Sequence, residues 1–202
     1  DVNRRPYTQA HPAAPPDWAQ TAEHRLLDAA LPLAPRLGWT RAMVLKAGEA
    51  AGFTAAESEL LIPNGAADLA ALLSRRHDAA ALAALSDLDP AQMKIRARIR
   101  AALEARLDAD AADLPAVRRL VGFLALPQHA ALGMRLQWES ADVLWRWAGD
   151  IATDENHYSK RAILAGVLTG ALAIRLQSGR EAAMTFVDAR IENVMAFEKW
   201  KA

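Results

Sequence analysis

The stretch TRAMVLKAGEAAGFTAAESELL, residues 40–61, predicts two short helices joined by a tight turn. Thr40 and Thr54 each precede a helix-forming run and are favourable N-caps, because a threonine hydroxyl accepts a hydrogen bond from a free backbone N–H. Gly52 follows the first run and suits the left-handed conformation that ends many helices. This helix–turn–helix pattern indicates an all-α protein with a small helical unit near its N-terminus.

The segments on either side also predict helices, and none of them has a pattern typical of a strand. Asp17 is placed to cap a helix that starts at Trp18, and Pro32 and Pro35 limit that helix. We expect about nine helices, the first from Trp18 and the others near residues 40–51, 54–61, 66–85, 91–109, 114–126, 130–148, 155–177 and 180–199. The chain divides into a disordered tail over 1–16, a helix-turn-helix-like unit over 17–86 and a larger helical ligand-binding and dimerisation unit over 87–202.

The composition fits this interpretation and excludes several classes of protein. Hydrophobic residues make up 52% of the 202 residues, so a sizeable core is easily buried. Lys and Arg balance Asp and Glu, which gives no net attraction to nucleic acid. Cysteine is absent, which removes disulfides and thiolate chemistry. The apolar run 162–174 is shorter than a membrane-spanning helix and predicts a core helix.

A small helix–turn–helix unit followed by a larger helical unit resembles the architecture of TetR-type regulators. DNA binding would require Lys or Arg where the second helix of the hairpin meets phosphate. No basic residue occurs between Ala47 and Ser74, whereas Glu57 and Glu59 lie on that second helix. We therefore predict that the hairpin does not bind DNA, and a ligand-responsive transcriptional regulator remains the alternative function.

The basic residues cluster instead on the helix predicted over 91–109. They are Lys94, Arg96, Arg98, Arg100 and Arg106. One interpretation is a contact with phosphate headgroups, and the other is a solvated face beside an apolar stripe. The second interpretation is favoured because charged runs on helices usually keep one face in water.

We expect no enzyme active site, metal site or cofactor. The histidines are scattered, and Asp154 with His157 offers a single Glu-x-x-His-like spacing where a di-metal helical bundle needs two. Asp150 and Asp154 stand near a helix start, where carboxylates usually serve as caps. The sequence also lacks a nucleophile elbow, a phosphate-binding loop and a dinucleotide glycine pattern.

The larger unit has the features of a pocket for an apolar ligand between helices. Gly166 and Gly170 lie four residues apart in the most apolar helix, where glycine permits close packing or leaves room for a ligand. We predict a lipid-sized cavity lined by the helices over 114–126, 130–148 and 155–177, and a homodimer formed through the last two helices. The candidate lipid-binding residues, all equally good core residues, are Trp138, Leu144, Trp145, Ile163, Val167 and Gly170.

Five motifs, in this order and spacing, resemble the coenzyme Q (ubiquinone) biosynthesis protein nine family. They are LGWT at 37–40, LIPNGAADL at 61–69, ALPQ at 125–128, WRWAGD at 145–150 and TDENHYSKRA at 153–162. The resemblance covers about residues 22–199. It implies a TetR-like fold without DNA binding, a homodimer, and a non-enzymatic accessory protein that binds isoprenoid quinone precursors.

The resemblance also implies a protein partner, the di-iron hydroxylase of demethoxyubiquinone or an equivalent biosynthetic enzyme. The positions that match the family's partner contacts are Asp142, Leu144, Tyr158 and Arg161, which we expect to form one surface patch. His157 replaces a tryptophan that is usual in the family, and tryptophan is a frequent interface anchor. The implied location is cytoplasmic, peripheral on the inner membrane through transient contact, or on the matrix side of that membrane in a eukaryote.

Overall fold

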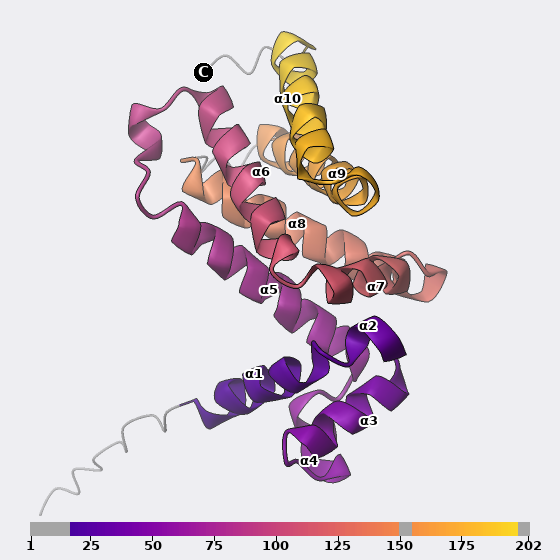
Figure 1. Cartoon of the computed structure of the whole chain (residues 1–202). Coiled ribbons are helices and arrows are strands. Elements are labelled where there is room, and N and C mark those ends of the chain that lie inside the picture. The colour runs from indigo at the N-terminus through magenta and orange to yellow at the C-terminus, as the bar shows by residue number, and fades with distance from the viewer. Residues whose placement is uncertain (1–16, 150–154, 198–202) are drawn as a thin grey trace, which may run out of the picture.

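The computed structural model describes residues 17–149 and 155–197, and all the regular structure in these ranges is helical (Figure 1). The predicted tail over 1–16 lies outside the described residues. The helices are α1 (Trp18–Ala30), α2 (Ala34–Leu37), α3 (Arg41–Ala50), α4 (Ala55–Leu61), α5 (Ala66–Ala84), α6 (Ile95–Ala111), α7 (Leu114–Leu124), α8 (Ala130–Trp147), α9 (Glu155–Ser178) and α10 (Arg180–Phe197), with short 3-10 turns η1 (Pro90–Gln92) and η2 (Pro127–His129). The all-α prediction is confirmed.

The predicted caps of the first helices are present. The side chain of Asp17 accepts a hydrogen bond from the backbone of Gln20 at 3.1 Å. Thr54 and Glu57 form a reciprocal capping box at the start of α4. Gly52 has a φ of 81°, as the turn between α3 and α4 requires.

One helix boundary was predicted wrongly, and one short helix was missed. Residues 91–94 do not belong to α6, because Asp89 caps the separate turn η1 and Met93 then adopts an extended conformation. The short helix α2 was missed, since Pro32 and Pro35 were interpreted only as limits on α1. Pro35 instead occupies the first turn of α2, where its missing N–H needs no partner.

The N-terminal core extends beyond the predicted N-terminal unit. Helices α1, α3 and α5 contribute Leu26, Met43 and Leu69, all fully buried. Helix α7 adds Val117 and Leu120 to the same cluster. The two parts of the chain therefore share a core, because α7 of the larger unit completes the core of the smaller unit.

The second core lies between α6, α8, α9 and α10. Its fully buried or nearly buried members include Leu103, Leu144, Trp145, Val167 and Val187. Figure 1 shows α9 and α10 side by side at the end of the molecule away from α3 and α4. The apolar stripe on α6 and the one on α10 both face this core.

A buried polar network joins α5 to the turn between α6 and α7. The ring nitrogens of His77 lie 2.9 Å from Asp110 and 2.7 Å from Asp113. Arg106 donates to Asp78 at 2.7 Å and to Asp110 at 2.5 Å. Burial opposes the ionisation of Asp110, but the charge of Arg106 and the hydrogen bond from His77 outweigh it and lower the pKa of this carboxyl. Each buried charge in the network thus has an opposite partner, as burial demands.

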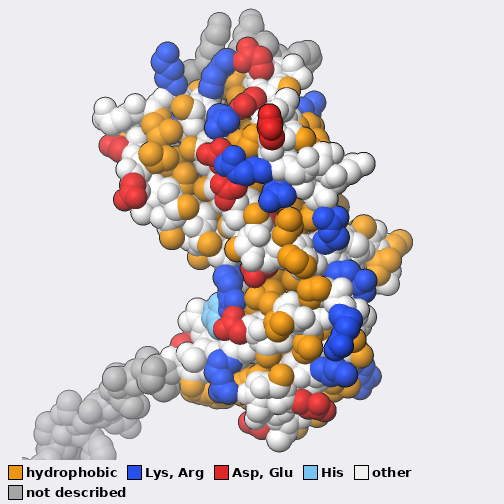
Figure 2. Space-filling view, in the orientation of Figure 1, with side chains coloured by type: hydrophobic (Ala, Val, Ile, Leu, Met, Phe, Trp, Pro, Cys, Tyr) orange, Lys and Arg blue, Asp and Glu red, His pale blue; other side chains and the backbone are white. Residues whose placement is uncertain are grey.

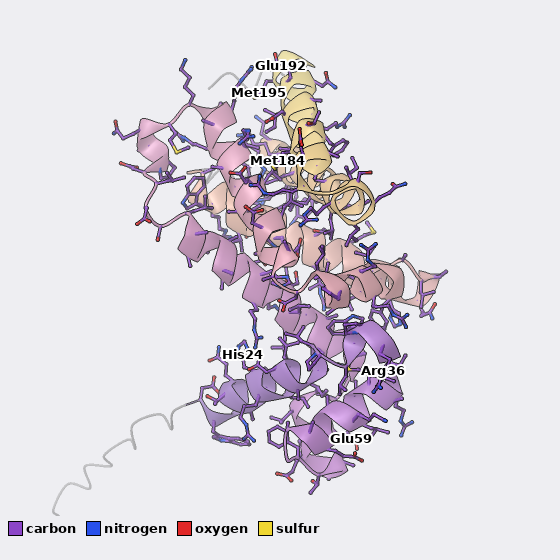
Figure 3. The ribbon with its side chains drawn as sticks, viewed as in Figure 1. His24, Arg36, Glu59, Met184, Glu192 and Met195 are labelled. Atoms are coloured by element: carbon purple, nitrogen blue, oxygen red, sulfur yellow. The ribbon has the colours of Figure 1, made fainter. Side chains whose placement is uncertain are left out.

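The basic residues of α6 are neutralised within the chain. Arg96 pairs with Glu192 at 2.6 Å and Arg100 with Asp188 at 2.7 Å, both on α10. Figure 3 shows Glu192 near the end of α10. Arg98 donates instead to the backbone carbonyl of Ala148 at 2.8 Å. These contacts leave little free charge for phosphate headgroups, so the favoured interpretation of a structural, solvated face fits the structure better.

Candidate binding surface at the junction of α8 and α9

A buried guanidinium fixes the start of α9 against α8. The side chain of Arg161 is 1% exposed, and its Nε donates to Asp142 at 2.8 Å. Its Nη1 also donates to the carbonyl of His157 at 3.2 Å. The second oxygen of Asp142 is 2.9 Å from Arg146, which lies one turn further along α8. Asp142 therefore links a buried cation to an exposed one.

Trp145 makes a second contact between the same two helices. It is 1% exposed, and its indole N–H donates to the carbonyl of Lys160 at 2.9 Å. The ammonium of Lys160 lies 5.5 Å from the centre of the Trp145 ring, within the range of a cation–π contact. A buried indole N–H needs such a partner, so Trp145 orients α9 as well as filling the core.

Tyr158 lies on the outside of this junction and is 62% exposed. Its ring centre is 6.1 Å from that of Trp138 and 5.1 Å from that of His157, in a tilted and an edge-on arrangement. These are favourable geometries for aromatic pairs. We call Trp138, His157 and Tyr158 the aromatic surface cluster.

The predicted surface patch is only partly at the surface. Leu144 and Arg161 are each 1% exposed, so neither presents a side chain to a partner in this conformation. Tyr158 is exposed, and Asp142 and His157 are half-buried. The correction has a simple physical reason: α8 and α9 face each other, so the residues on their facing sides are buried between them.

The predicted lipid-binding residues are spread over three environments. Leu144 and Trp145 are part of the packed core, and Trp138 belongs to the aromatic surface cluster. Gly170 is covered by Phe186, whose Cζ would be only 2.8 Å from a β-carbon at residue 170. Of the six candidates, only Ile163 and Val167 line the apolar cavity described next.

This cavity measures about 10 Å³, roughly the space that one water molecule needs. It lies between α6, α9 and α10, and not between α7, α8 and α9 as predicted. Its lining residues are Ile99, Leu103, Ile163, Leu164, Val167, Arg190, Ile191, Val194 and Met195. A lipid at this position would require these helices to separate, and the lipid-sized cavity between α7, α8 and α9 stays a prediction.

The contribution of α6 and α10 to the cavity was missed from the sequence. The apolar stripes that contain Ile99 and Ile191 are both evident as helical patterns, but a stripe does not reveal which helix it faces. Figure 3 shows Met184 and Met195 on α10, which lies beside α6 in the same view. No sequence signal identified this pairing, since which helices lie opposite each other is decided by the tertiary packing.

Two absences hold for residues 17–149 and 155–197. No helix there is both long enough and apolar enough to cross a bilayer. No group of three or more His, Asp or Glu side chains is arranged to hold a metal ion. Asp150 and Asp154 lie outside these ranges.

Comparisons with known proteins match the part of the chain that contains the junction of α8 and α9. The family model COQ9 matches residues 130–198, which extend from the start of α8 through α10. The mitochondrial ubiquinone biosynthesis protein COQ9 of Rattus norvegicus is 28% identical over 182 residues, which cover 86% of this chain and 58% of the rat protein. The corresponding proteins of Bos taurus and Homo sapiens are 26% and 24% identical over 86% of this chain and 57% of their own lengths. The chain thus spans less than two thirds of these relatives, and its segment from α8 through α10 is similar to the COQ9 family.

Proposed function

We propose that this protein is a non-enzymatic, lipid-binding accessory protein of ubiquinone biosynthesis that presents isoprenoid quinone intermediates to a hydroxylase partner. The similarity to ubiquinone biosynthesis proteins over 86% of the chain is the observation that carries the proposal. The segment that matches the family model contains α9 and α10, which line the apolar cavity, and residues of the aromatic surface cluster. A regulator of the TetR type is less well supported, because Glu57 and Glu59 are exposed on α4.

In this proposal the lipid enters between α6, α9 and α10. The surface of the cavity wall is apolar throughout, because Arg190 lines it only with the aliphatic part of its side chain, and such a wall suits an isoprenoid tail. Val194 and Met195 are only partly buried, so the outer end of α10 is less firmly packed than its middle. Methionine side chains adapt easily to a new neighbour, which favours opening at this point.

Lipid extraction tests this step. Protein purified without detergent should release an isoprenoid quinone or its precursor, identified by mass spectrometry. Val194→Trp should fill the cavity and abolish that lipid, whereas Val121→Trp, at a partly buried valine of the other core, should not. Absence of lipid from the unsubstituted protein, or equal loss in both variants, would argue against lipid binding at this position.

The proposed partner contacts the aromatic surface cluster. Tyr158 combines a rigid, exposed ring with neighbouring aromatic and charged side chains, and such residues commonly anchor interfaces. The di-iron demethoxyubiquinone hydroxylase, or an equivalent enzyme, is the partner we propose. Presentation of the lipid would bring the cavity-bearing unit and the hydroxylase together through α8 and α9.

Binding measurements with the purified hydroxylase test the contact. Tyr158→Ala should weaken the complex by about 1–3 kcal/mol, and His157→Trp should strengthen it. Leu60→Ala is a suitable control, because Leu60 is 84% exposed on α4, far along the chain from this junction. Equal affinities for Tyr158→Ala and Leu60→Ala would place the contact elsewhere.

A further inference from the structure

Two segments without any acidic residue lie side by side in the fold. Residues 29–48 contain Arg36, Arg41 and Lys46, and residues 114–138 contain Arg118, Arg119 and Arg135. Helix α2 packs on α7, and the indole N–H of Trp39 donates to the carbonyl of Ala116 at 3.0 Å. The guanidinium of Arg119 also lies against Gly38. The tertiary structure thus joins two basic segments that are far apart in the sequence.

Most of these cations have no carboxylate partner. Arg36, Arg41, Lys46, Arg118 and Arg119 are exposed, and none of them forms an ion pair with the described residues. Only Arg135 approaches a carboxylate, that of Glu139, at 3.9 Å. The cations of α6 are different, since Arg96 and Arg100 pair with α10. We call the five unpaired residues the basic face.

An apolar tip adjoins the basic face where α7 turns into α8. The turn η2 is held by stacking of Phe123 on His129, with ring centres 3.9 Å apart. Leu126 on this turn is 43% exposed, and Met134 on the first turns of α8 is 74% exposed. In Figure 1 this hairpin extends away from the rest of the molecule. This hairpin thus exposes two large aliphatic side chains close to the arginines of α7.

The two features are continuous on the surface. In Figure 2, blue side chains run down the edge of the molecule over the region of α7, α2 and α3, and orange side chains of the hairpin lie beside them. Leu45, between Arg41 and Lys46 on α3, is 46% exposed. Figure 3 shows Arg36 on the same edge of the molecule, and Glu59 on α4 lies further from α7.

We propose that the basic face and the apolar tip dock together on a bilayer that contains acidic phospholipids. The tip would insert Leu126 and Met134 among the acyl chains, while the arginines meet phosphate groups at the surface. This combination favours a bilayer over nucleic acid, because DNA offers phosphate but no apolar layer for the tip.

The inference goes beyond the proposed function and does not depend on it. The cavity between α6, α9 and α10 and the aromatic surface cluster use none of the residues of the basic face. Vesicle binding is therefore measurable without a quinone or a hydroxylase. A protein that carries lipid could fail to bind vesicles, and a protein that binds vesicles could carry no lipid.

Flotation with phosphatidylcholine vesicles, with and without phosphatidylglycerol, tests the proposal. The unsubstituted protein should bind the vesicles that contain phosphatidylglycerol, and binding should decline as salt increases, since salt screens exposed charges. Arg36→Glu combined with Arg41→Glu should lower the partition coefficient by about tenfold or more. Leu126→Ser combined with Met134→Ser should lower it as well and reduce the part of binding that resists salt.

Lys94→Glu combined with Arg96→Glu is the matched control. It changes the net charge equally, and both residues are exposed at the start of α6, away from the basic face. The control should bind vesicles as the unsubstituted protein does. Circular dichroism should show that all the variants fold alike.

Three results would overturn the proposal. The first is no binding of the unsubstituted protein to the acidic vesicles. The second is an equal loss in the control and in the Arg36→Glu, Arg41→Glu protein, which would indicate an effect of net charge alone. The third is displacement from vesicles by short duplex DNA while Leu126→Ser with Met134→Ser binds normally, which would indicate a polyanion site without insertion.

Discussion

The ring of Phe186 on α10 occupies the space where a side chain on residue 170 of α9 would begin. Its Cζ and Cε1 lie 2.8 Å and 3.1 Å from the position of a β-carbon on Gly170. A glycine in the middle of a helix costs about 1 kcal/mol relative to alanine. Here that cost is offset by close packing of α9 on α10, and the glycine does not leave room for a ligand.

Gly170→Ala should therefore destabilise the protein by about 1–2 kcal/mol, because the strain of overpacking exceeds the gain in helix propensity. Chemical denaturation followed by circular dichroism measures this change. Phe186→Leu in the same chain should relieve part of the strain. A more stable Gly170→Ala protein would show that Phe186 shifts without cost.

Gly166 is the contrasting case, and it corrects an expectation from the sequence. Nothing lies within 4 Å of a β-carbon placed on Gly166, so a larger side chain meets no obstacle inside the chain. We still predict a homodimer through α9 and α10. In that case Gly166→Leu should weaken the dimer, whereas Gly122→Leu, at an equally open glycine of α7, should not. Sedimentation equilibrium distinguishes the two variants, and identical dimer constants would place the interface elsewhere.

Arg161→Met should destabilise the fold by about 3–5 kcal/mol, because it leaves Asp142 without its buried partner. Tyr158→Ala should change stability by less than about 0.5 kcal/mol, since the ring is 62% exposed. Thermal unfolding of the two variants checks this contrast. A mild effect of Arg161→Met would mean that Asp142 finds a sufficient partner in Arg146.

Acid should weaken the contact between α5 and the end of α6. The pKa of Asp110 in the folded protein is lowered from its ordinary value of 3.8. Its contribution to stability is therefore complete above that value and is lost as the pH falls through the folded pKa. Asp110→Asn should be less stable at neutral pH and should show a smaller further loss below about pH 4. Parallel acid denaturation curves for the two proteins would contradict this assignment.

Trp39→Phe should loosen α7 from the N-terminal core. Trp39 is 4% exposed, and its indole N–H donates to the carbonyl of Ala116. Removing the donor takes away one of the two hydrogen bonds of the Ala116 carbonyl, which keeps its bond within α7, and the loss costs about 0.5–1.5 kcal/mol. Hydrogen exchange should accelerate in α7 more than in α9. Uniform acceleration would show that the two cores unfold as one unit.

Local signals in the sequence were sufficient for much of the fold. Thr54 with Glu57 and Gly52 with its left-handed φ are determined within a few residues, so the hairpin of α3 and α4 was predictable. The motifs that resemble the family also depend only on residue order. Sequence alone therefore determined the helical class, most of the helix ends and the resemblance to the family.

The tertiary structure decided which residues face inward and which charges are neutralised. Arg161 was expected at the surface but is buried, because α8 supplies Asp142 against it. Arg96 was expected on a solvated face but forms an ion pair with Glu192 on α10. Arg36 and Arg119, on the adjacent helices α2 and α7, have no carboxylate partner among the described residues. Helical periodicity gives the direction of a side chain relative to its own helix only. Its burial and its charge partner depend on how distant helices pack, which no local pattern specifies.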